Sequence, residues 1–99
     1  MSNTMTGAWS NFNFSLTDEA HKVFKEALKG FVGVEYTPMA FATQVVSGVN
    51  YCYLCKGVIA TQGAPQTAVK LYVFAPLPRQ GNAHLSQIIN ISPVPPDSY

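Results

Sequence analysis

The 99-residue chain has the length of a single domain, and its hydrophobic content of 47% is enough for a packed core, which excludes wholesale disorder. Charged residues make up only 11% of the chain, and six Lys and Arg against five Asp and Glu leave a net charge of +1. The cations are scattered, so we do not expect a nucleic-acid partner, which needs clustered cations to neutralise phosphates. No apolar run reaches the roughly 18 residues of a membrane-spanning helix, so no membrane partner is expected.

Residues 1–13 form a polar opening segment that contains Trp9 and Phe12. We expect this segment to be an arm outside the core, which becomes a strand or docks through its aromatic side chains. Its first residues lack the charged and apolar regions of a signal peptide. Two cysteines do not suggest the disulfide framework of a small secreted domain, so we expect a cytoplasmic protein.

The next segment has the pattern of an amphipathic helix. Apolar residues recur along one face at helical spacing, at Ala20, Val23, Phe24, Ala27, Leu28 and Phe31. Thr17 or Ser15 can cap the amino end, and acidic residues follow in the first turn, where the helix dipole favours them. Gly30 and Gly33 offer places for the helix to end.

Four segments rich in Val, Ile, Tyr, Phe and Thr predict β-strands after this helix, over residues 34–46, 49–60, 66–74 and 85–91. Pro38 predicts a bulge or bend in the first strand. The proline-rich residues 92–99 cannot continue a sheet and should form an extended tail. One helix followed by consecutive hairpins predicts a single α+β domain over residues 1–99, with the helix packed across a four- to five-stranded antiparallel sheet.

The turn between the first two predicted strands carries a motif. Gln44-Val45-Val46-Ser47-Gly48, followed by Asn50-Tyr51, resembles the Gln-x-Val-x-Gly signature of the cystatins, in the form typical of the stefins. Other segments are similar to stefins in the same order: the helix, the strand ending in Leu77-Pro78-Arg79-Gln80, and Gly7-Ala8 near the start. We call residues 44–48 the first loop and residues 77–80 the second loop. The resemblance extends from Gly7 to about Ile91.

The resemblance to cystatins implies that this chain is a reversible competitive inhibitor of papain-like cysteine proteases. Such an inhibitor performs no catalysis and needs no metal or cofactor. By this resemblance, Gly7 and Ala8 in the arm, the first loop and the second loop would together fill the active-site cleft of the protease. Arg79 is the only ionisable residue among them. A neutral wedge of this kind can enter a narrow apolar groove without the cost of desolvating charge.

Cys52 and Cys55 have the spacing of a redox or zinc motif. Residues three apart in a strand point to opposite faces of the sheet, so we expect one cysteine to face inward, the other outward, and no disulfide between them. Zinc would need two further ligands, for which only His21 and His84 are candidates. A nucleophile built from Cys55 and His84 would lack a third, orienting group, so an enzyme is not expected.

The main alternative is a cystatin-fold module that has lost inhibition and binds another protein through a sheet face or an edge strand. A small-ligand pocket between helix and sheet is a third possibility. Inhibition requires that the arm, the first loop and the second loop line up at one end of the fold. The first loop also joins two long strands, and Val45 and Val46 favour extended backbone, which predicts a monomer that can convert slowly to a domain-swapped dimer.

Overall fold

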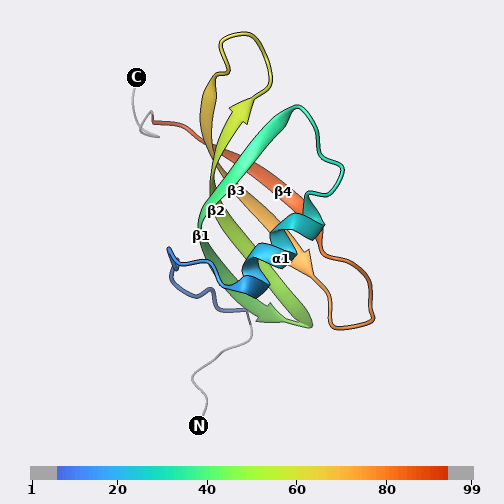
Figure 1. Ribbon diagram of the computed structural model, residues 1–99. Helices are drawn as coiled ribbons and strands as arrows, with labels where there is room; N and C mark the ends of the chain where they lie inside the picture. Colours follow the sequence, from blue (N-terminus) through green and yellow to red (C-terminus); the bar gives the residue numbers. More distant parts are fainter. Residues whose placement is uncertain (1–6, 94–99) are drawn as a thin grey trace.

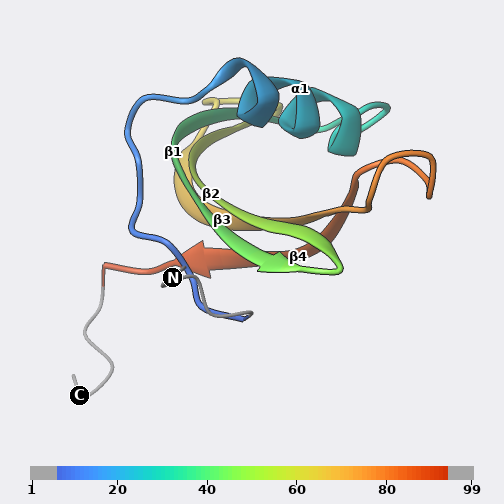
Figure 2. The same cartoon turned by 90° about the horizontal axis from the view of Figure 1, so that it is seen from below.

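A computed structural model describes residues 7–93. The elements are α1 (Asp18–Ala27), β1 (Val34–Val46), β2 (Gly48–Ile59), β3 (Gln66–Ala75) and β4 (His84–Ile91). The strands form one antiparallel sheet in the order β1-β2-β3-β4, and α1 lies across one face of it (Figure 1). Figure 2 shows how the sheet curves around the helix. The predicted α+β arrangement is therefore confirmed, with four strands in the described part of the chain.

The helix begins where the sequence predicts and ends earlier. The Thr17 hydroxyl caps it by accepting a hydrogen bond of 3.1 Å from the Ala20 N–H. Leu28 is already the carboxyl-terminal cap, and Gly30 follows with a φ of +85°. The prediction that Phe31 continues the buried stripe was wrong: the chain has turned by then, and the Phe31 side chain is 45% exposed.

The core lies between α1 and the face of the sheet that α1 covers. Tyr53 and Leu71 in neighbouring strands are fully buried there, and the Phe24 ring from α1 packs edge-on against Tyr53 with a centroid distance of 4.9 Å. The Tyr53 hydroxyl donates a hydrogen bond of 2.8 Å to the Ala20 carbonyl, so its polar atom is satisfied inside the core. Burial of one such large side chain stabilises the fold by about 2–3 kcal/mol.

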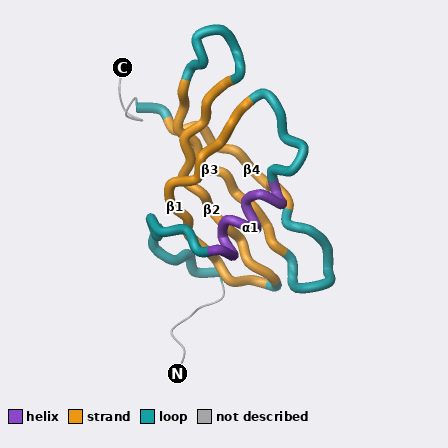
Figure 3. The backbone as a smooth tube through the Cα atoms, viewed as in Figure 1, coloured by secondary structure: helices purple, strands orange, loops and turns teal. Residues whose placement is uncertain are grey.

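All four predicted strands are present. The pairing of β1 with β2 shifts between Pro38 and Ala40, which confirms the bulge expected at Pro38, and Met39 at the bulge is 53% exposed. Figure 3 shows that the long connections lie at opposite ends of the sheet, residues 60–65 at one end and 76–83 at the other. Of the predicted tail, residues 94–99 lie outside the described residues.

The arm lies along the outer edge of β1, where backbone hydrogen bonds hold it in addition to the predicted aromatic contact, which Trp9 makes with Tyr72. The Ser10 N–H donates to the Thr43 carbonyl at 2.8 Å, and Asn13 and Phe41 exchange two backbone hydrogen bonds of 2.8 and 3.0 Å. These contacts make two isolated bridges and no fifth strand within residues 7–93. Residues 1–6 of the predicted arm lie outside the described residues.

Candidate functional site

The arm and both loops come together at one end of the sheet. Because successive strands are antiparallel neighbours, β1 ends where β2 begins, and β3 ends there too. Ser47 alone separates β1 from β2, and residues 76–83 connect β3 to β4 at the same end (Figure 1). The arm reaches this end through Gly7, whose N–H donates to the Val45 carbonyl at 3.2 Å.

A chain of hydrogen bonds joins the arm to the first loop. The Gln44 amide donates from Nε2 to the Gly7 carbonyl at 2.7 Å. Its Oε1 accepts a second bond of 2.7 Å from Nδ2 of Asn50, which lies opposite Gln44 on β2. Gly7 is thus bonded through both its N–H and its carbonyl, and it adopts a φ of +94° that suits glycine. These bonds fix the arm and the first loop relative to each other before any partner binds.

Gly48 brings the first loop against the base of the β3–β4 connection. It is buried, has a φ of +120°, and a Cβ placed on it would lie 2.7 Å from the Ala75 carbonyl oxygen. The next residue, Val49, pairs with Ala75 across the ladder. Only glycine allows this close backbone approach, so the turn at Ser47 depends on Gly48 for its position beside β3.

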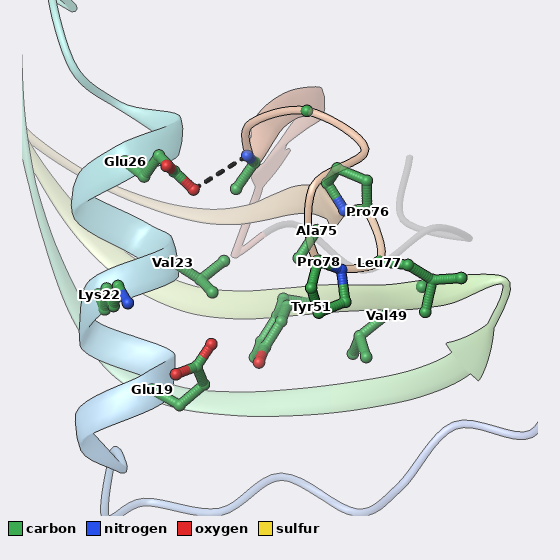
Figure 4. A pocket seen from close by; sticks show the side chains of 13 residues that line it. Glu19, Lys22, Val23, Glu26, Val49, Tyr51, Ala75, Pro76, Leu77 and Pro78 are labelled. Carbon is green, nitrogen blue, oxygen red and sulfur yellow. Dashed lines mark hydrogen bonds between the residues drawn. The ribbon is translucent and has the colours of Figure 1, made fainter.

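The second loop is a tight turn tied to the helix. The Gln80 N–H donates to the Leu77 carbonyl at 3.0 Å, Pro78 fixes the first bend, and Arg79 has a φ of +68°. Below the turn, the Ala83 N–H donates to Oε1 of Glu26 in α1 at 3.0 Å (Figure 4). The connection is therefore held from the helix side as well as by its two strands.

A cleft of about 400 Å³ lies between α1 and the β3–β4 connection (Figure 4). Val23 of α1, Val49 and Tyr51 of β2, and Leu77 contribute to its apolar walls, and Glu19 adds a carboxylate. Burial raises the pKa of the Tyr51 hydroxyl, and Glu19 adds to this effect. Large buried side chains, among them Phe24, Tyr53 and Leu71, pack between the helix and the sheet, and this cleft lies beside the second loop.

The predicted site residues differ in how they face solvent. Gln44 and Val46 are half-buried, and Gly48 is buried. The others are exposed: Gly7, Ala8, Val45, Ser47, Leu77, Pro78, Arg79 and Gln80. Val45 and Leu77 expose 46% and 44% of their surface, one on each loop. The predicted site residues therefore present apolar side chains on fixed backbone, and Arg79 is the only charged residue among them.

Several residues that shape this end were not predicted as site residues. Asn50 stands in the signature sequence, so its role in orienting Gln44 could have been suspected there. Glu26 carries no local signal, because its contact joins distant segments. Trp9 was expected to dock as an aromatic residue of the arm, but its place beside Gln44 was not predicted. Glu26 holds Ala83, 57 residues away, and the backbone of Trp9 bridges to Gln44.

The two cysteines lie on opposite faces of the sheet, as predicted, yet both are buried free thiols. Cys55 belongs to the core under α1, and burial raises its pKa to about 12. Cys52 is on the outer face, where it shares a cavity of about 160 Å³ with Trp9 and Phe12 of the arm. Burial also raises its pKa, against smaller lowering effects from a hydrogen bond with Tyr72 and the charge of Lys70. The arm thus covers the thiol that was expected to face outward.

Two other kinds of site lack the residues they need within residues 7–93. No group of three or more His, Cys, Asp or Glu side chains is placed to hold a metal ion. No helix in this part of the chain has the length and apolar character needed to cross a membrane.

Comparison with protein-family models, with curated proteins and with solved structures finds no match to this chain. The class that the described residues define is an α+β domain with one helix across an open, four-stranded antiparallel sheet.

Proposed function

We propose that this chain is a cystatin-like, reversible competitive inhibitor of papain-like cysteine proteases. The observation that carries the proposal is the hydrogen bonding of Gly7 to Gln44 and Val45, which joins the arm to the first loop at the end of the sheet that also bears the second loop. These are the segments that the sequence resemblance implies for protease binding. Their order along the chain and their common position support one continuous binding edge.

The chemistry of this edge suits a narrow apolar cleft. Val45 and Leu77 expose apolar surface that would lose contact with water on binding. Arg79 is the only charged residue among the proposed contacts, so little charge has to be desolvated. Backbone and side-chain hydrogen bonds already fix both loops, so they lose little entropy on docking.

The proposed binding mode explains how the chain would avoid cleavage. Gly7 has no side chain, so its backbone can pass close to a catalytic cysteine, and an added Cβ would find open space in the free chain. By the family resemblance, residues before Gly7 enter the non-primed subsites and the two loops rest on the primed side. No peptide bond of the inhibitor then lies in line with the nucleophile.

Titration of papain with the full chain tests the proposal. We expect stoichiometric loss of peptide hydrolysis, recovery of activity on dilution, and no effect on trypsin, whose catalytic nucleophile is a serine. Full papain activity at a large molar excess of the chain would overturn the proposal. That result would favour a module that binds another protein through its outer face, where Trp9 and Phe12 each expose 42% of their surface.

A further inference from the structure

The two outer edges of the sheet, β1 and β4, differ in whether another described segment of the chain hydrogen-bonds to them. The arm covers the β1 edge from Phe41 to Val45, because Gly7, Ser10 and Asn13 hydrogen-bond to its backbone there, and the earlier part of β1 carries Glu35, Pro38 and the bulge. Among residues 7–93, β4 has β3 as its only neighbouring strand (Figure 1). A strand with one neighbour presents a row of backbone N–H and C=O groups along its other side, ready to pair with a further strand.

Most of β4 lacks the features that usually protect such an edge. The register with β3 shifts once, at Ser86, and from Gln87 to Ile91 the pairing is unbroken. These five residues, Gln-Ile-Ile-Asn-Ile, contain no charge and no proline. Ile88 and Ile91 expose 39% and 40% of their surface. Edge strands of monomeric proteins are usually blunted by charged residues, prolines or bulges, and only the first part of β4 is blunted in this way.

We infer that two copies of this chain associate edge to edge through residues 87–91 of β4. The strands would run antiparallel about a two-fold axis, and the two four-stranded sheets would become one. An axis through Ile88 or Ile89 places an isoleucine opposite its own copy, which is a favourable cross-strand pair. Residues 87–91 carry no charge that would favour a charged partner. A second copy of the same strand can match their free backbone N–H and C=O groups and pair isoleucine with isoleucine.

The chain's own tail is a poorer occupant of this edge. Residues 92–99 contain Pro93, Pro95 and Pro96, which have no N–H to donate to a ladder. The contact between copies is short, so the association should be weak, rapid and reversible, as expected for a small interface.

This association leaves the candidate site open and does not rest on the proposed function. The first and second loops lie at the His84 end of β4, whereas the pairing segment runs from Gln87 toward the other end. A domain-swapped dimer differs from it in two respects. It straightens the first loop and so removes part of the site, and it forms slowly because strands must be exchanged.

Sedimentation equilibrium of the full chain from micromolar to millimolar concentration tests the inference. We expect the average mass to rise from 10.7 kDa toward twice that value and to fall again on dilution. The double variant Gln87→Lys/Asn90→Lys replaces two exposed residues of the edge and should weaken association at least about tenfold. The control His21→Lys/Gln62→Lys adds lysines at exposed positions away from β4 and should associate like the unmodified chain.

A mass that stays at the monomer value up to millimolar concentration would overturn the inference. Association of the Gln87→Lys/Asn90→Lys variant equal to that of the control would also overturn it. Should that variant fail to fold by circular dichroism, Ile91→Lys at the end of the strand is the second test, with the same expected loss. Because mass is the measured quantity, failure here is distinct from failure to inhibit papain.

Discussion

The side-chain amide of Gln44 donates a 2.7 Å hydrogen bond to the carbonyl of Gly7, a residue 37 positions earlier in the chain. Asn50 holds this amide in orientation by donating to its Oε1 at 2.7 Å. The two bonds join the arm and the first loop into one edge. The chain also carries a reporter of this state, because its single tryptophan, Trp9, packs its ring edge-on against Tyr72 at 5.8 Å when the arm is docked.

Replacement of Gln44 by Glu should release the arm. The carboxylate cannot donate to the Gly7 carbonyl, and loss of one hydrogen bond of about 1 kcal/mol should loosen arm docking roughly fivefold. We expect a red shift of Trp9 fluorescence and faster dissociation from papain. The control Gln62→Glu makes the same charge change at an exposed position in the β2–β3 loop. An unchanged Trp9 spectrum in Gln44→Glu would show that this bond does not hold the arm.

Replacement of Val45 by Asp should weaken papain binding far more than it weakens the fold. Val45 is 46% exposed in the free chain, so an added carboxylate there remains hydrated and the free energy of unfolding should change little. In the proposed complex the same charge is buried without a partner, at a cost of about 2–5 kcal/mol. The matched control is Val32→Asp, at a position 86% exposed and outside both loops. Equal inhibition constants for the two variants would place the first loop outside the interface.

Deletion of residues 1–13 should expose one thiol and leave the other protected. Cys52 is covered by Trp9 and Phe12 of the arm, whereas Cys55 is covered by the helix and neighbouring strands. We therefore expect slow reaction of both thiols with a maleimide in the full chain and rapid reaction of Cys52 alone after deletion. Mass spectrometry of the labelled peptides measures this. A Cys52→Ser change in the shortened chain should abolish the label, and rapid labelling of Cys55 would contradict the assignment.

Stability should fall above pH 9. Burial raises the pKa of Cys55 from 9.0 to about 12, so between these values the unfolded chain has lost a proton that the folded chain retains. The stabilisation is complete below pH 9 and is lost as the pH rises toward 12, at up to about 1.4 kcal/mol per pH unit for this group. Urea denaturation under reducing conditions at several pH values measures the slope. Cys55→Val, which lacks the thiol, should show a shallower decline, and an identical slope would contradict this origin.

The sequence predicted the elements well because their signals are local. Residues 34–46 are rich in the β-branched and aromatic residues that favour strands, and they form β1. Pro38 marks the bulge in this strand because it has no N–H to donate to the neighbouring strand. The helix was predicted too long, since the apolar spacing continues to Phe31 although the chain turns at Gly30. Periodicity reports which face of a segment is apolar, and it does not report where the backbone leaves the helix.

The candidate site was only partly predictable. The first loop follows from its glycine turn and its resemblance to a known signature. The bond from Ala83 to Glu26, the covering of Cys52 by Trp9 and the cleft beside the second loop depend on segments that meet only after folding. No local pattern encodes such contacts, because the spacing of residues along the chain constrains only neighbours in the same element.

The sheet order β1-β2-β3-β4 matches the order of the strands along the chain, so each strand pairs with the one made just before it. Such a sheet can assemble by successive hairpins, each closing a short loop at low entropic cost. During synthesis, β3 remains the outermost strand until β4 emerges. The growing chain therefore carries an open edge from its first hairpin onward, and within residues 7–93 the eight-residue β4 alone pairs with the far edge of β3.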